Sequence, residues 1–376
     1  MFVLRKILIA FGISALLLVG VVVYVFVIPS SYEPEYSFND VELADLSSGP
    51  AGEIWFPGFN ARQASDLLNG GVEAVREPVV GTLYLPPEAS AENPVPAFVI
   101  LHGSGGDFTN RSIHLAKKLA AVGIAGFAVD TFRSRKLAED DDYYERLKKA
   151  SIYTQMADAF NALKTLQEHP MIRGDLIGVT GFSIGATSAQ YTAFEQLAEP
   201  MLEENGPRFA AHVMFYTGCN LDFEDFRLSG APWLVMLGSA DESTSASHCE
   251  TLLAKARSAG VSAELKVYDG AGHGWDQPYE LQFFPDAFVT RDCVAYMTSD
   301  GDVIEKGSGW SYENGLTLML AFRTCATKGY SQGRHDAANI QSVQDTLTFL
   351  DVVWGGSWSE RLTSEILLIG IPEDKS

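Results

Sequence analysis

Basic residues are scarce in this chain of 376 residues: 27 Lys and Arg stand against 48 Asp and Glu, and the formal net charge is −21. A surface of this sign repels phosphate backbones, which argues against binding of nucleic acid. Internal repeats and low-complexity stretches are also lacking. Because 47% of the residues are hydrophobic and 20% are charged, the chain can still bury a sizeable core.

Charge is absent altogether from residues 7–28, which read ILIAFGISALLLVGVVVYVFVI. As a helix, this segment would be about 33 Å long, the thickness of a bilayer core. Arg5 and Lys6 precede it and the next basic residue is Arg62. The positive-inside rule therefore places the N-terminus in the cytoplasm and the rest on the exported side, periplasmic or extracellular. No A-x-A-like cleavage site follows, which favours a transmembrane anchor over a removed signal peptide.

Cysteine is sparse, with four residues in the whole chain. None of them forms a C-x-x-C pair, so a metal site of the zinc type is not expected. An even number of cysteines in an exported chain favours disulfides. Cys219 follows one predicted strand and Cys249 begins the helix after the next, whereas Cys293 and Cys325 bracket a predicted hairpin. This topology predicts the pairs Cys219–Cys249 and Cys293–Cys325.

Short apolar runs alternate with amphipathic segments through most of the chain. The predicted strands are 95–103, 124–130, 176–182, 209–218, 232–239 and 262–270. The predicted helices are 111–123, 151–170, 184–198, 246–260 and 338–354. This alternation predicts an α/β fold whose mostly parallel sheet carries helices on both faces. Two early strands within 73–86, broken at Pro78, are expected at an antiparallel edge.

The alternation stops at about 276–337, which we interpret as an insertion before the last helix. Residues 293–305 resemble a hairpin in which Asp300 and Gly301 form the two-residue turn. The predicted domain organisation has three parts. They are a cytoplasmic tip and anchor at 1–29, a linker at 30–52 and a single domain at 53–376.

The motif G-x-S-x-G occurs at residues 181–185, within VTGFSIGATSAQ. Composition alone produces this motif too often for it to indicate a function. Here it lies between an apolar strand and a helix, which is the context of a nucleophile elbow. The backbone turns so sharply there that the neighbours of the nucleophile, Gly181 and Gly185, must be small. Ser183 is therefore the predicted nucleophile.

A serine hydroxyl needs a base to act as a nucleophile near neutral pH. His273 lies in the Gly-rich loop DGAGHGW directly after the last long strand, at the carboxyl edge of the predicted sheet. Asp241, on a short loop after the strand WLVMLGSAD, is the predicted acid that orients the histidine. The alternatives for this acid are Glu242, Asp222 and Asp225.

A tetrahedral intermediate needs two donors for its oxyanion. The first is expected to be the backbone amide of Ile184, directly after the nucleophile. The second is expected in the Gly-rich loop HGSGGDF at 102–108, where Ser104 is favoured and Gly105 is the alternative.

Two further features are candidates for substrate binding, namely Arg133 with its neighbour Arg135, and Trp275. Arg133 and Arg135 follow the strand that ends at Asp130, near the predicted site. They could bind a substrate carboxylate, or pair with Asp130 or a nearby acidic run. Trp275 closely follows the predicted histidine and could line an acyl pocket or pack in the core.

Several segments, in this order, resemble the successive blocks of dienelactone hydrolase-like α/β-hydrolases. They are VPAFVILHGSGG, VDTFRSR, ALKTLQEHPMIRGDLIGVTGFSIGA, PWLVMLGSADE and YDGAGHGWD. The resemblance covers about 75–355 and implies an eight-stranded, mostly parallel sheet. It also implies hydrolysis of carboxylic esters or lactones without a metal or other cofactor. Ser183, Asp241 and His273 match the triad positions, although founding members carry Cys where Ser183 stands.

The sequence thus predicts a serine hydrolase that is tethered to a membrane through residues 7–28 and acts on a small ester or lactone. The alternatives on the same fold are a peptidase or an acyltransferase. A non-catalytic binding module would be a protein of another class.

Overall fold

The computed structural model describes residues 32–142, 145–146, 149–312 and 315–372. The apolar segment at 7–28 lies outside the described residues. Within these ranges, none of the helices combines the length and the hydropathy needed to cross a bilayer.

An eight-stranded sheet forms the centre of the domain, with the strand order β1-β2-β4-β3-β5-β6-β8-β9. Strands β1 and β2 pair antiparallel, β2 also pairs antiparallel with β4, and all the other pairs are parallel. This confirms the predicted α/β fold with a mostly parallel sheet. The strands are β1 (Gly52–Asn60), β2 (Val75–Tyr84), β3 (Val95–Leu101), β4 (Ala125–Val129), β5 (Ile172–Phe182), β6 (His212–Phe215), β8 (Trp233–Gly238) and β9 (Ala263–Tyr268).

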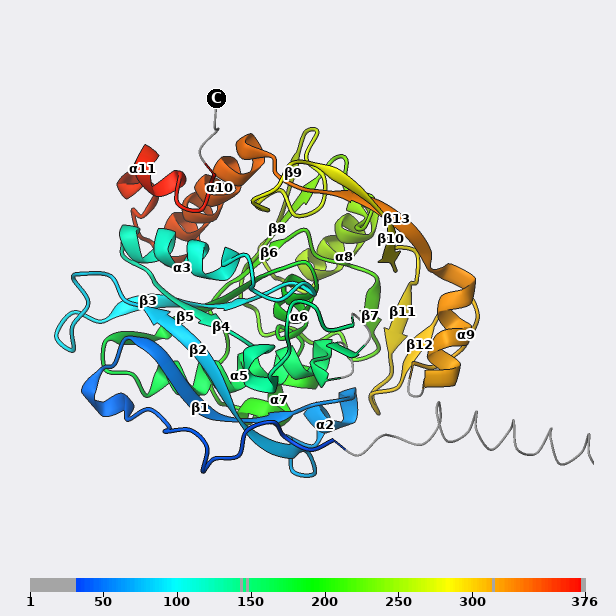
Figure 1. Cartoon of the computed structure of the whole chain (residues 1–376), viewed down its shortest axis with the longest axis horizontal. Helices are drawn as coiled ribbons and strands as arrows, with labels where there is room; N and C mark the ends of the chain where they lie inside the picture. The colour runs from blue at the N-terminus through cyan, green and yellow to red at the C-terminus, as the bar shows by residue number, and fades with distance from the viewer. Residues whose placement is uncertain (1–31, 143–144, 147–148, 313–314, 373–376) are drawn as a thin grey trace, which may run out of the picture.

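Helices cover both faces of this sheet (Figure 1). One face carries α3 (Arg111–Val122), α10 (Asp336–Trp354) and the short α11 (Ser364–Leu367). The other carries α2 (Ala64–Leu68), α5 (Ile152–Gln167), α6 (Ile184–Tyr191), α7 (Glu195–Leu202) and α8 (Ala246–Ser258).

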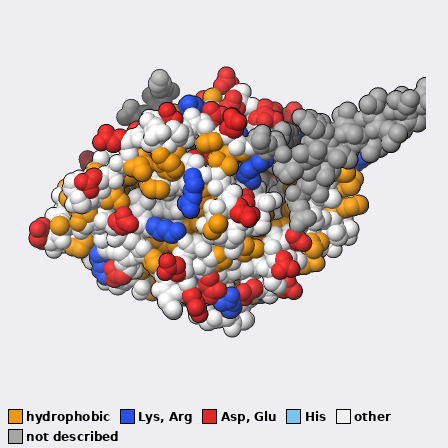
Figure 2. Space-filling view, turned by 90° about the horizontal axis from the view of Figure 1, so that it is seen from below, with side chains coloured by type: hydrophobic (Ala, Val, Ile, Leu, Met, Phe, Trp, Pro, Cys, Tyr) orange, Lys and Arg blue, Asp and Glu red, His pale blue; other side chains and the backbone are white. Residues whose placement is uncertain are grey.

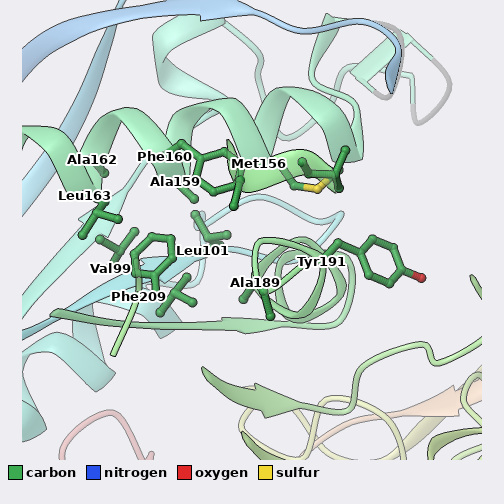
Figure 3. Close-up of a cluster of buried hydrophobic side chains, with 14 of the residues drawn as sticks. Val99, Leu101, Met156, Ala159, Phe160, Ala162, Leu163, Ala189, Tyr191 and Phe209 are labelled. Atoms are coloured by element: carbon green, nitrogen blue, oxygen red, sulfur yellow. The ribbon is translucent and has the colours of Figure 1, made fainter. Parts of the chain in front are cut away.

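The central strands are largely apolar because each of their faces is buried against helices. In β3, Phe98 and Ile100 belong to the cluster beneath α3 and α10. Val99 and Leu101 point to the other face, where they pack with Phe160 and its neighbours on α5 (Figure 3). On the outer surface, the view in Figure 2 shows basic side chains standing among acidic and apolar ones.

Two predicted elements differ from the structure. The segment at 73–86 is one strand, β2, and it runs through Pro78 without a break. Pro57 of β1 lies opposite Pro78, and β4 pairs only with residues 81–84, so little ladder bonding is lost at the two prolines. The predicted helix at 184–198 is divided into α6 and α7. The chain turns at Phe194, whose ring is buried against Phe223 with the centroids 3.7 Å apart.

The insertion lies along one side of the domain, in yellow and orange in Figure 1. It contains β10 (Gln282–Val289), β11 (Ala295–Met297), β12 (Val303–Glu305), α9 (Gly315–Cys325) and β13 (Thr327–Gln332). Strand β10 pairs with β13, and β11 pairs with both β12 and the short β7 (Leu221–Phe223) of the body.

The predicted hairpin is present as β11 and β12, but its turn is not the predicted two-residue one. Residues 298–302 form the connection, with hydrogen bonds from the Thr298 amide to the Asp302 carbonyl and from the Gly301 amide to the Thr298 carbonyl. Gly301 has φ +94°, a value that glycine adopts easily. The dipeptide Asp-Gly therefore marks the turn correctly but does not set its length.

The predicted linker at 30–52 is described from Tyr32 onward, and this part contacts the domain before β1 begins at Gly52. The Tyr32 hydroxyl donates to Glu77 of β2 at 2.6 Å, and Glu35 pairs with Lys149 at 2.8 Å. A short 3-10 turn, η1 (Leu46–Ser48), then leads into β1.

Both predicted disulfides are confirmed. Cys219–Cys249 joins the loop after β6 to α8, and Cys293–Cys325 joins the loop after β10 to the end of α9. The sequence separations are 30 and 32 residues. In the chain-entropy model, a loop of this length stabilises the folded state by roughly 3–4 kcal/mol. The second disulfide thus restrains an insertion that has few buried aliphatic side chains.

Candidate active site

Ser183 lies between the end of β5 and the start of α6, with φ +54° and ψ −117°. A residue with a side chain is strained at such a φ, and strain of this kind concentrates at functional sites. Glycine is required at positions 181 and 185 because other backbone atoms approach both residues closely. A Cβ on Gly181 would lie 2.4 Å from the backbone of Gly185, and one on Gly185 would lie 2.4 Å from the His102 carbonyl oxygen.

His273 and Asp241 complete a hydrogen-bonded chain with this serine. The Oγ of Ser183 lies 2.9 Å from Nε2 of His273, and Nδ1 of His273 lies 2.8 Å from Oδ2 of Asp241. The side chains of His273 and Asp241 are only 5% and 1% exposed, so water hardly competes for these contacts. The structure thus brings together the three residues that the sequence predicts as a triad.

The environment of Asp241 keeps its carboxyl group ionised. Burial alone would raise its pKa, but the adjacent His273, together with hydrogen bonds from Thr244 and Ser243, holds the pKa below its usual value. The amides of Ser243 and Thr244 donate to Oδ1 at 2.7 and 3.2 Å, which leaves Oδ2 for the imidazole. The carboxylate is therefore held in one orientation and stays negatively charged.

The three alternative acids are engaged elsewhere. Glu242 accepts a hydrogen bond from the Ser331 amide at 2.9 Å. Asp222 pairs with Lys255 and Lys306, and Asp225 pairs with Arg227.

The predicted oxyanion donors lie in the wall of the cavity into which Ser183 opens. Ser104 and Ile184 both line this cavity. Ile184 is the first residue of α6, and the first amides of a helix have no partner within the helix. The loop that carries Ser104 runs close to the nucleophile, because a Cβ on Gly103 would lie 3.7 Å from that of Ser183.

A buried network beside His273 was missed by the sequence reasoning. Tyr216 follows β6 with φ +41°, and its ring packs edge-to-face on His273 with the centroids 4.8 Å apart. Its hydroxyl donates to Asp276 and accepts from Arg111 at 3.0 Å. Burial, with Asp276 nearby, raises the pKa of Tyr216 well above its usual value, so this hydroxyl stays protonated. The only sequence signal is a tyrosine directly after a strand, in FYTG.

The structure places neither candidate substrate-binding residue at the site, and for both of them the structural alternative applies. Arg133 lies in the 3-10 turn η2 (Arg133–Arg135), half exposed, and pairs with Glu53 at 2.6 Å. Trp275 is fully buried in the core, where its Nε1 donates to Ser342 at 3.3 Å. Neither residue lines the cavities next to Ser183.

Arg135 has a structural role that the sequence left open. Its guanidinium is fully buried and pairs with Asp158 of α5 at 2.9 Å and with Glu77 of β2 at 2.7 Å. These partners are not the acidic residues weighed from the sequence. A buried charge needs such partners because its desolvation is costly.

Two cavities meet at Ser183 and His273. The larger has a volume of about 390 Å³ and is bordered mostly by apolar and aromatic side chains. The smaller cavity has a volume of about 130 Å³. It is bordered by the backbone of Gly103 and Gly105 and by polar side chains that include Arg146 and Gln277. Among the described residues, no cluster of three or more His, Cys, Asp or Glu side chains could hold a metal ion.

Solved structures similar to this chain include several of one esterase and one of a phosphotriesterase. Propionate-bound esterase 2 of the planctomycete Thermogutta terrifontis is 16% identical, with a TM-score of 0.42, and the match covers 53% of this chain and 81% of that one. The dienelactone hydrolase-like promiscuous phosphotriesterase P91, from metagenomic libraries, is 17% identical, with a TM-score of 0.45 and coverages of 60% and 86%. No curated protein is significantly similar to the chain in sequence.

The assignment to a family rests on a family model. The model of the dienelactone hydrolase family matches residues 80–289, which is more than half of the chain. The matched region runs from β2 to β10 and includes the elbow serine, Asp241 and His273. The chain therefore belongs to the dienelactone hydrolase family and is a hydrolase with an α/β-hydrolase fold.

Proposed function

We propose that this protein is a serine hydrolase that cleaves carboxylic esters or lactones through a covalent acyl-enzyme. One observation carries the proposal: Ser183, His273 and Asp241 form a continuous hydrogen-bonded chain whose serine opens into a cavity. A serine, a base and an orienting acid in this order are the machinery of acyl transfer.

In the first half of the reaction, Oγ of Ser183 attacks the carbonyl carbon of the ester while Nε2 of His273 takes the serine proton. The carbonyl oxygen becomes an oxyanion, which the amides of Ile184 and Ser104 stabilise by donating hydrogen bonds. When the intermediate collapses, the bond to the alkoxy oxygen breaks. His273 returns the proton to that oxygen, and the alcohol leaves.

In the second half, a water molecule attacks the acyl-enzyme while His273 takes one of its protons. Collapse breaks the bond to Oγ, which recovers its proton, and the carboxylic acid departs. Asp241 holds the imidazole by its Nδ1 proton and stabilises the positive charge that forms in both halves.

The test is hydrolysis of p-nitrophenyl acetate, butyrate and hexanoate by the purified protein. We expect release of p-nitrophenol from at least one of the three esters, at a rate that a metal chelator does not change. If none of them is hydrolysed above the background rate, the proposal is wrong, and a peptidase or a binding module becomes the better explanation.

We further propose that the domain is exported and held at a membrane by residues 7–28. The support is the uncharged length of that segment and the two disulfides, which persist in oxidising compartments. The full-length chain is expected to stay in the membrane fraction after washing with alkaline carbonate. A shortened chain beginning near Ser30 in the soluble exported fraction would show that the segment is removed.

A further inference from the structure

The larger cavity beside Ser183 lies between the body of the domain and the insertion. The body contributes aromatic and aliphatic side chains, including Tyr153, Tyr191 and Leu221. Figure 3 shows Tyr191 extending away from the core cluster beneath α5. The insertion contributes the facing wall, with Phe288, Ala295, Val303, Tyr312, Leu318 and Phe322. The insertion thus forms part of the binding site and is more than an addition to the surface.

Three connections fix this wall in place. Ala295 of β11 pairs with Leu221 of β7, so one strand register joins the insertion to the body. Cys293, which lines the cavity, is bonded to Cys325 at the end of α9. On α9, the ring of Phe322 packs edge-to-face on Phe288 at 5.2 Å. A wall held by pairing, a disulfide and ring contacts is formed before the substrate binds, which reduces the entropic cost of binding.

The wall also reaches the catalytic residues. Tyr330 of β13 lines both cavities, and its ring lies edge-to-face to that of His273 with the centroids 5.3 Å apart. Gly333, just after β13, donates its amide to the His273 carbonyl at 3.2 Å. A group that fills the larger cavity is therefore next to the reacting atoms.

The size and lining of the larger cavity indicate which kind of group it accepts. An apolar cavity of about 150 Å³ is enough to bind benzene. The present cavity, at about 390 Å³, admits an aromatic ring together with the short chain that would connect it to Ser183. Rings prefer edge-to-face or offset contact with other rings, and aromatic side chains make up much of this lining.

The smaller cavity suits the other half of an ester. Gln277 and Arg146 line it together with the Gly-rich loop. These polar groups can solvate a departing alcohol and the water that attacks the acyl-enzyme. The apolar cavity is then left for the acyl group.

We propose that the insertion forms an acyl pocket that makes the enzyme selective for esters of aryl-substituted carboxylic acids. This inference rests on the proposed function, since it assigns the substrate class of the same site. Leu318 and Phe322 of α9 are the residues that set the size of the pocket.

The test compares p-nitrophenyl 3-phenylpropanoate with p-nitrophenyl acetate, which share a leaving group. In the wild-type protein, we expect kcat/KM to be at least about tenfold higher for the aryl ester, because burial of a ring stabilises the transition state. Leu318→Trp should remove most of this preference by filling the pocket, so that the ratio of the two kcat/KM values falls toward one.

Met319→Trp is the matched control, because Met319 is the next residue on α9, is exposed and does not line the cavity. This variant should keep the preference for the aryl ester. Because the preference is a ratio measured within one variant, partial unfolding does not mimic the expected result.

The outcomes separate this inference from the proposed function. If acetate is cleaved but the wild-type protein shows no preference for the aryl ester, the acyl pocket is wrong and the hydrolase function stands. The esters 2-phenylethyl acetate and ethyl acetate share an acyl group and differ in their alcohol. If the aryl preference in kcat/KM appears between these two instead, the apolar cavity binds the alcohol and the inference is overturned. If neither of these p-nitrophenyl esters nor the butyrate and hexanoate esters are cleaved, the proposed function fails as well.

Discussion

Ser183→Ala is expected to lower kcat for p-nitrophenyl ester hydrolysis by a factor on the order of 10⁴ or more, because the members of a triad act as one unit. The hydroxyl is the group that would form the acyl-enzyme, and its Oγ lies 2.9 Å from Nε2 of the base, His273. Steady-state kinetics on the purified variant and the wild-type protein measures the loss.

The variant should fold normally, which makes the kinetic result easy to interpret. Alanine and serine both carry a Cβ, so the strain at φ +54° is the same in both proteins. The melting temperature is therefore expected to stay close to that of the wild type. A folded Ser183→Ala protein that retains more than about a tenth of the wild-type kcat would contradict the role of this serine.

Asp241→Asn is expected to lower kcat by a factor on the order of 10⁴ while leaving the fold intact. The asparagine oxygen can still accept from the amides of Ser243 and Thr244. Its NH2 group then faces Nδ1 of His273, which forces the imidazole into the tautomer that carries its proton on Nε2. That tautomer cannot accept the proton of Ser183.

Glu242→Gln is the matched control for this substitution. Glu242 is the adjacent carboxylate and was an alternative acid in the sequence reasoning, but it contacts Ser331 instead of the histidine. Its amide variant should retain kcat within about threefold of wild type, as expected for a residue outside the triad. A large loss in Glu242→Gln together with a small one in Asp241→Asn would reverse the assignment of the acid.

The elements that position the site could be predicted from the sequence because each of them has a strong local pattern. The strand before Ser183 ends in a mostly apolar run, LIGVTGF, and Gly181 and Gly185 have no room for a side chain. Asp241 follows the apolar strand β8 and His273 follows the edge strand β9, both on short loops. Parallel strands carry their carboxyl ends to one edge of the sheet. The disulfide pairs followed from the same topology.

The substrate-binding residues could not be predicted in this way. Arg133 and Arg135 are two positions apart, yet one pairs with Glu53 at the surface and the other is buried between Glu77 and Asp158. Which charge becomes buried depends on partners that are distant in sequence. The position of Trp275 could not be predicted either, because a residue on the histidine loop can reach both the core beside α10 and the cavity.

The insertion was only partly predictable because its elements are short and rely on contacts with the body. The three-residue strands β11 and β12 are joined to the body through β7, which is itself only three residues long. Helix α9 has a single buried residue, Ala321. A helix that buries so little needs no regular apolar stripe, so its sequence gives only a weak amphipathic signal. The side chains that the insertion contributes to the larger cavity, including Ala295, Val303, Leu318 and Phe322, come from these same elements and therefore became evident only in the structure.

The central claim is that Ser183 forms the covalent intermediate, and labelling with a fluorophosphonate measures this directly. After reaction of the wild-type protein and digestion, mass spectrometry should find the phosphonyl adduct on the peptide containing residues 181–185, at Ser183. The adduct should be absent from Ser183→Ala and greatly slowed in His273→Ala, where the base that activates the hydroxyl is missing. Labelling that persists in Ser183→Ala, or an adduct located on another residue of the wild-type protein, would contradict the account.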